Sequence, residues 1–150
     1  MGFKTVDEVI DFAIRKEDDA AKMYTELADR VEYEYMSRLL LEFAREEKGH
    51  KAKLLAIKEG KYLVPATEKI MTLGIADNAV AIEPGPDMDF QDALLLAMKE
   101  EKAAFAMYTK LAESTDDPDL KSTLLALAQE EAKHKLRFEL EYDEHVLTEG

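Results

Sequence analysis

Residues 42–55, EFAREEKGHKAKLL, carry charges as a water-facing helix does, but an acid and an imidazole interrupt the apolar face. The surrounding apolar residues recur every three or four positions, as on one buried helix face. They are Met36, Leu39, Leu40, Phe43, Leu54 and Ile57. Glu47 and His50 fall where this rhythm would continue. The pattern therefore predicts a helix that places a carboxylate and an imidazole in a core.

The same features return 84 residues later, because LLEFAREEKGHK (40–51) aligns with LLALAQEEAKHK (124–135). At the same offset, AIRKEDDAAKMYTELAD (13–29) aligns without gaps with AMKEEKAAFAMYTKLAE (97–113). Two halves that repeat in this way can be related by a pseudo-twofold axis. Such an axis would bring the equivalent residues of the two halves together.

Helical periodicity predicts four helices. Their expected ranges are 6–31, 35–57, 89–113 and 118–145. Thr5 followed by Glu8 reads as a capping box at the start of the first helix. Asp117 before Pro118 is a typical start for the fourth, because proline suits the first helical position.

The connections between these helices are uneven. Short links within the repeat halves, at about 5–60 and 88–147, predict two antiparallel helix hairpins. The long crossover 61–87 can climb the whole bundle, so the second and third helices are expected to run parallel. The expected fold is an all-α four-helix bundle that forms one domain over residues 1–150.

Each predicted helix contributes an acid on its apolar face, and two helices add a histidine. Glu17 and Glu101 interrupt the stripes of the first and third helices. The second and fourth helices each carry Glu-x-x-His, whose two side chains are neighbours on one helix surface. The candidate metal ligands and catalytic residues are Glu17, Glu47, His50, Glu101, Glu131 and His134.

A single acid in such a stripe is usually a helix-edge residue whose charge reaches water. The combined set is different, since buried carboxylates without partners are costly and these stripes hold no Lys or Arg. Four carboxylates and two neutral imidazoles would be neutralised by two divalent cations. Mixed carboxylate and imidazole ligands favour iron, manganese or zinc, and helix bundles use this set for di-iron or di-manganese centres.

The pattern A-[IM]-x-x-E-x-x-A-x-x-M-Y occurs at 13–24 and 97–108, and E-E-x-x-H at 46–50 and 130–134. Together these motifs resemble those of the ferritin-like di-iron proteins, most closely the rubrerythrin family. The resemblance implies a ferritin-like bundle with two iron ions as cofactor, although manganese or a mixed metal pair remains open. It also implies that the Glu residues of the two Glu-x-x-His pairs, Glu47 and Glu131, bridge the metals.

Two departures from the family pattern matter. Rubrerythrins often carry a further Glu one turn after the third-helix ligand, for redox-linked ligand exchange, but the residue here is Ala104. Ala104 has no side-chain atom that could serve as that ligand. Rubrerythrins proper also add a cysteine-rich iron domain that supplies electrons. The 150 residues contain no cysteine, so we expect an external electron-donor protein.

By this resemblance we expect an oxidoreductase that reduces hydrogen peroxide, or dioxygen, in oxidative-stress defence. Several alternatives remain. An iron-binding or ferroxidase protein would oxidise and hold iron without turning over peroxide. A di-manganese catalase shares the ligand plan and would release dioxygen. The ligands are also compatible with a metal ion that only stabilises the fold, or with a hydroxylase of organic substrates.

The composition and the apolar segments of the sequence indicate which partners and which location to expect. With 33 acids against 20 bases, the net charge of −13 repels nucleic acid and anionic membrane surfaces. The sequence has neither a run apolar enough to span a bilayer nor a secretory signal, so we expect a cytoplasmic protein. A homodimer is expected because the crossover is rich in apolar side chains that need cover. These are Ile70, Met71, Leu73, Ile75, Val80 and Ile82.

Several other polar residues accompany the candidate ligands. Tyr24 and Tyr108 lie two turns after the candidate ligand of their own helix, where a phenol could hydrogen-bond a ligand carboxylate or simply pack in the core. Glu46 and Glu130 could orient a histidine, although solvent is their default, because consecutive helical residues point about 100° apart. His145 is expected at the surface.

Overall fold

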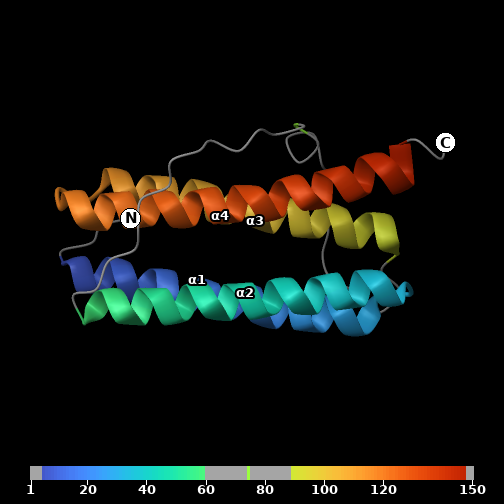
Figure 1. The fold of residues 1–150 in the computed structure, drawn as a ribbon, viewed down its shortest axis with the longest axis horizontal. Coiled ribbons are helices and arrows are strands. Elements are labelled where there is room, and N and C mark those ends of the chain that lie inside the picture. The colour runs from blue at the N-terminus through green and yellow to red at the C-terminus, as the bar shows by residue number, and fades with distance from the viewer. Residues whose placement is uncertain (1–4, 60–73, 75–88, 148–150) are drawn as a thin grey trace.

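The computed structural model describes residues 5–59, 74 and 89–147, which form long helices lying side by side (Figure 1). The elements are α1 (Val6–Arg30), α2 (Glu34–Lys58), α3 (Phe90–Glu113), α4 (Pro118–Tyr142) and a π-helical turn, η2 (Asp143–Leu147). Helix α1 packs against α2, and α3 packs against α4. The predicted all-α bundle of two antiparallel hairpins is confirmed.

The first and fourth helices begin where their cap residues predict. Thr5 Oγ1 accepts a hydrogen bond from the backbone N–H of Glu8 at 3.1 Å. Asp117 Oδ1 accepts one from the backbone N–H of Leu120 at 3.2 Å. The fourth helix is shorter than expected, because its α-helical part ends at Tyr142 and the chain continues as η2.

The two hairpins stack with α1 against α3 and α2 against α4. Helices α2 and α3 both run from right to left in Figure 1, so they are parallel, as a long connection allows. The expected crossover, 61–87, lies outside the described residues apart from Gly74. The apolar side chains on which the homodimer expectation rests lie outside them as well.

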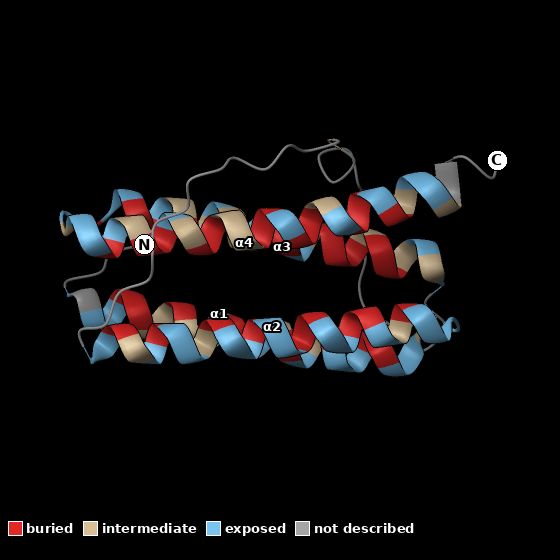
Figure 2. Cartoon of the chain, in the orientation of Figure 1, coloured by how far each residue is buried: buried red, intermediate tan, exposed pale blue. Residues whose placement is uncertain are grey.

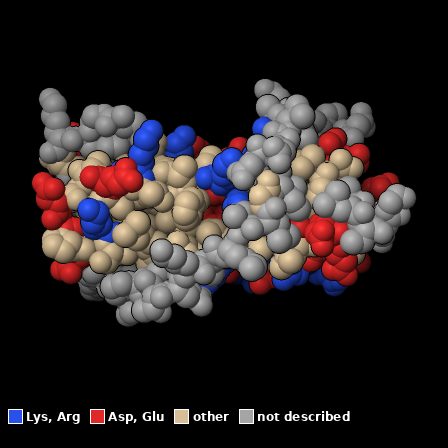
Figure 3. Space-filling view, turned by 90° about the horizontal axis from the view of Figure 1, so that it is seen from above, with Lys and Arg blue, Asp and Glu red and all other residues tan. Residues whose placement is uncertain are grey.

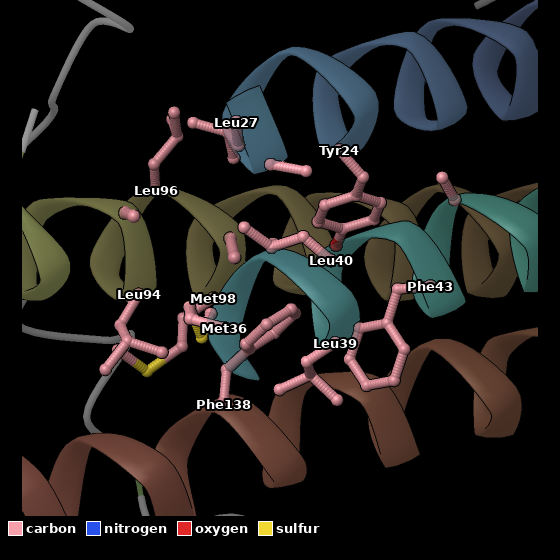
Figure 4. Packing of buried hydrophobic residues seen from close by; sticks show 14 residues of the cluster. Tyr24, Leu27, Met36, Leu39, Leu40, Phe43, Leu94, Leu96, Met98 and Phe138 are labelled. Carbon is pink, nitrogen blue, oxygen red and sulfur yellow. The ribbon is translucent and has the colours of Figure 1, made fainter. Parts of the chain in front are cut away.

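Buried residues lie along the inner faces of all four helices (Figure 2). They form two apolar clusters, one toward each end. The first cluster includes Tyr24, Leu27, Met36, Leu40, Phe43 and Phe138 (Figure 4). The second includes Ile10, Leu54, Tyr108, Leu111, Leu120 and Leu124. On each helix, the candidate metal ligands lie between the residues of one cluster and those of the other.

Most of the other charged side chains lie on the outer surface, which Figure 3 shows from above. Within the described ranges, no helix combines the length and the apolar character needed to cross a membrane.

Candidate metal centre

Four carboxylates and two imidazoles meet at the middle of the bundle. Helix α1 supplies Glu17, α3 supplies Glu101, and α2 and α4 each supply a Glu-x-x-His pair. All six side chains are buried, with exposed fractions from 0% for Glu131 to 4% for His134. The structure thus brings together all six residues that the sequence singles out.

The donor atoms of these residues form two overlapping groups, and within each group they lie within 4.8 Å of one another. The first group contains Glu17, Glu47, His50 and Glu131. The second contains Glu47, Glu101, Glu131 and His134. Each group outlines one possible metal position. Glu47 and Glu131 belong to both groups, so they lie between the two positions. Exchanging the repeat halves converts one group into the other, as a pseudo-twofold axis requires.

Two buried tyrosines each donate a hydrogen bond to one carboxylate oxygen of this cluster. Tyr24 donates a hydrogen bond from its hydroxyl to Glu101 Oε1, and Tyr108 donates one to Glu17 Oε1. Each tyrosine therefore reaches the acid of the other repeat half and not the acid of its own helix. Both acids keep their second oxygen, Oε2, free of hydrogen bonds.

Eight buried oxygen and nitrogen atoms of the cluster make no hydrogen bond of good geometry, although several of them lie within ion-pair distance of one another. They are Oε2 of Glu17 and Glu101, both carboxylate oxygens of Glu47 and Glu131, and Nδ1 of His50 and His134. A buried polar atom without a partner costs about 1–3 kcal/mol and is rare in native proteins. Eight such atoms facing one another could serve as the ligand atoms of a metal site, with two oxygens from each shared acid and one atom from each other residue.

The imidazoles lie close to carboxylates from the opposite hairpin. His50 Nδ1 is 2.8 Å from Glu131 Oε1 of the opposite hairpin, and it also lies 3.5 Å from Glu17 Oε2 of its own hairpin. His134 Nδ1 is 3.2 Å from Glu47 Oε1. These separations connect α2 with α4 in both directions, so the site depends on how the two hairpins pack.

Burial and mutual charge shift the acid–base equilibria of the cluster. Burial raises the pKa of Glu47 to about 9; the negative charges of Glu131 and Glu17 add to the rise, and His134 opposes it. Burial by itself would lower the pKa of His50, but Glu131 and Glu17 outweigh it and raise the pKa to about 10. Without metal, the cluster therefore holds protons at neutral pH that a bound cation would displace.

The rubrerythrin family model matches residues 8–142, which include all six residues of the cluster. The chain belongs to the rubrerythrin family. Neither the comparison with curated proteins nor the comparison with solved structures gave a match. Because the rubrerythrin family binds iron, the buried cluster of this rubrerythrin chain is a site that could hold a metal ion.

Glu46 and Glu130 are the two acids that could orient a histidine, and one of them lies beside a histidine in the structure. Glu46 Oε2 lies 3.2 Å from His134 Nε2, although the Glu46 side chain is half-exposed. Glu130, its equivalent in the second repeat, lies 3.7 Å from Lys133 instead. His145 lies on η2, outside both donor groups, and its Nε2 is 3.2 Å from Glu141 Oε2.

Sequence reasoning missed the contact between Phe43 and His134, whose rings stack with centroids 4.1 Å apart and an interplanar angle of 17°. Phe43 also packs edge-on against Phe138, with a centroid distance of 4.9 Å (Figure 4). The one signal in the sequence was a difference between the repeats, because Leu127 is the equivalent of Phe43.

Proposed function

We propose that this rubrerythrin-family chain is a di-iron peroxidase that reduces hydrogen peroxide to water with electrons from an external donor protein. The observation that carries the proposal is the convergence of the six buried residues into two ligand groups that share Glu47 and Glu131. Membership of an iron-binding family of oxidoreductase character supports the same conclusion.

The carboxylate and imidazole ligands would suit two divalent cations such as ferrous ions. Glu47 and Glu131, which belong to both donor groups, would bridge the ions, and each position would gain one further acid and one histidine. Four ligand atoms at each ion would leave coordination positions for an oxygen substrate. The four carboxylates would balance the charge of two divalent cations, which removes the repulsion that burial otherwise imposes.

When bound, a pair of ferrous ions supplies the two electrons that cleave the O–O bond. In the overall reaction, hydrogen peroxide takes up two electrons and two protons and becomes two water molecules. The donor protein then returns two electrons, since the 150 residues contain no cysteine to hold a second iron site of the cysteine-bound kind.

The protein's own residues would position the ligands and exclude water. Tyr24 and Tyr108 hold the outer acids, Glu101 and Glu17, by hydrogen bonds that leave the unpaired oxygen of each acid facing the cluster. The apolar clusters on either side of the site separate it from bulk water along the bundle axis. A water-poor, preorganised site strengthens electrostatic interactions with the substrate.

The test is anaerobic mixing of the reduced, iron-loaded protein with hydrogen peroxide, after metal analysis of the purified chain. We expect about two irons per chain, oxidised by an equivalent of peroxide faster than by dioxygen and without dioxygen release. Dioxygen release from a manganese-loaded protein would indicate a catalase, and iron binding without peroxide turnover would indicate an iron-handling protein. Absence of bound metal would overturn the proposal.

A further inference from the structure

We propose that Glu46 is a positioning residue that makes the two metal positions unequal, so that the Glu101–His134 position binds its metal first and more tightly. This inference rests on the proposed function, because it takes His134 as a ligand. Glu46 itself is not among the residues of either donor group.

The first observation is the way His134 uses its two ring nitrogens. Nδ1 faces the cluster, 3.2 Å from Glu47 Oε1 and 3.3 Å from Glu101 Oε2. Nε2 faces the other way and lies 3.2 Å from Glu46 Oε2. A carboxylate at the outer nitrogen keeps a proton on that nitrogen, which leaves the lone pair of the inner nitrogen for a metal.

The second observation is that the repeat does not reproduce this arrangement. Glu130 has the position equivalent to Glu46, but its carboxylate lies 3.7 Å from Lys133, on its own helix. His50 Nδ1 faces the cluster as His134 Nδ1 does. In the described part of the chain, no side chain pairs with the outer nitrogen of His50, so its tautomer and orientation are less constrained.

The third observation concerns the faces of the two imidazoles. The ring of Phe43 stacks on His134 at 4.1 Å between centroids. At the equivalent position beside His50, the sequence has Leu127, which has no aromatic ring to stack. His134 is thus restrained both at its outer nitrogen and on its ring face. Among the described residues, no acid pairs with the outer nitrogen of His50, and the ring stacked on it is that of His134, at 5.9 Å between centroids.

A more basic and better oriented imidazole binds a divalent metal more tightly, and loss of such an outer partner typically lowers metal affinity about 10–100-fold. Both positions share Glu47 and Glu131, so those ligands do not distinguish them. The difference between the positions must therefore arise outside the shared acids, and Glu46 contacts a histidine of the cluster whereas its equivalent, Glu130, contacts Lys133 instead.

The experiment is an anaerobic titration of the metal-free full chain with Co²⁺, followed by calorimetry and by the visible absorption of the bound ion. Wild type is expected to bind two ions in separate steps. In Glu46→Ala, the affinity of the tighter step should fall about 10–100-fold and its absorption spectrum should change. Glu46→Gln keeps an acceptor oxygen without the charge. The affinity of its tighter step should therefore lie between that of wild type and that of Glu46→Ala.

Glu130→Ala is the matched control, because it removes the same charge at the equivalent position of the other repeat. It should leave the tighter step unchanged. A second pair of variants assigns the steps to positions, since Glu17→Ala should retain the tighter step and Glu101→Ala should lose it. Thermal melts of the metal-free variants separate a loss of folding from a loss of affinity.

Two equal steps in wild type would overturn the inference while leaving the dinuclear site intact. Equal weakening by Glu46→Ala and Glu130→Ala would overturn it too, because the effect would then be one of net charge alone. No Co²⁺ binding to folded wild type would overturn the proposed function together with this inference.

Discussion

Tyr24 on α1 donates a hydrogen bond to Glu101 on α3, so the first repeat half fixes a carboxylate of the second. Tyr108 returns the contact by donating to Glu17. Both contacts are buried and both connect the two hairpins. Each half of the chain therefore completes the site of the other half, which couples the packing of the hairpins to the geometry of the cluster.

Replacing Tyr24 by Phe keeps the ring in the core but leaves Glu101 Oε1 without its donor. We expect the metal-free protein to lose about 1–3 kcal/mol of unfolding free energy, the usual consequence of an unsatisfied buried acceptor. Urea denaturation would measure it. Tyr108→Phe should behave alike, because it removes the equivalent bond to Glu17.

The control for this pair is Tyr142→Phe. The Tyr142 hydroxyl accepts a bond from Gln91 at 3.3 Å at the solvent-exposed surface, so its loss should change stability by no more than about 0.5 kcal/mol. If all three variants unfolded at the same urea concentration as wild type, the tyrosine–carboxylate contacts would contribute nothing to stability.

Removal of a shared acid should affect both metal positions, whereas removal of an outer acid should affect one. Glu47→Ala deletes donor atoms from both groups, and Glu17→Ala deletes them from one. We expect Glu17→Ala to retain close to half of the wild-type metal after gel filtration and Glu47→Ala to retain far less. Metal analysis by mass spectrometry would decide. The reverse order would mean that Glu47 does not bridge.

The stabilisation that metal confers should grow as the pH rises. The folded metal-free chain keeps a proton on Glu47 up to a pKa of about 9, whereas the ordinary value is 4.5. It also keeps His50 protonated up to about 10, against an ordinary 6.5. A raised folded-state pKa stabilises below the unfolded value, and that contribution is lost as the pH rises through the folded value.

The melting temperature of the metal-free protein should therefore fall between about pH 5 and pH 9, because the unfolded chain releases these protons in that range while the folded chain keeps them. Metal replaces those protons, and its apparent affinity should rise by about tenfold per pH unit for each proton displaced. Differential scanning calorimetry of both forms at several pH values is the measurement. If the melting temperatures of the metal-free and metal-bound forms changed with pH by the same amount, the assignment of the protons to the cluster would be contradicted.

Phe43→Leu would give the first repeat the residue that the second repeat has. The change removes the stack on His134 and the edge contact with Phe138, so we expect a loss of about 0.5–1.5 kcal/mol from the aromatic contacts. Chemical denaturation would measure this loss. Leu125→Ala is a suitable control, because Leu125 is exposed and its truncation should change stability little. Equal stability of the two variants would show that the aromatic stack is energetically neutral.

Much of the fold follows from patterns that are local in the sequence. The apolar spacing and the cap residues Thr5 and Asp117 predict the helices, and the structure has them at closely similar bounds. The end of the fourth helix differs, since the chain passes into a π-helical turn after Tyr142. No residue between Tyr142 and His145 signals that change, because the charged pattern there suits an α-helix equally well.

The six buried acids and histidines are also determined by the sequence, because their spacing depends on one helix at a time and the repeat doubles it. Which side chains meet across helices is decided by the tertiary structure alone. Tyr24 meets Glu101, and Glu46 meets His134 while Glu130 meets Lys133. These contacts depend on the rotation and offset of each helix against its neighbours, and the residue spacing within one helix does not specify either of them.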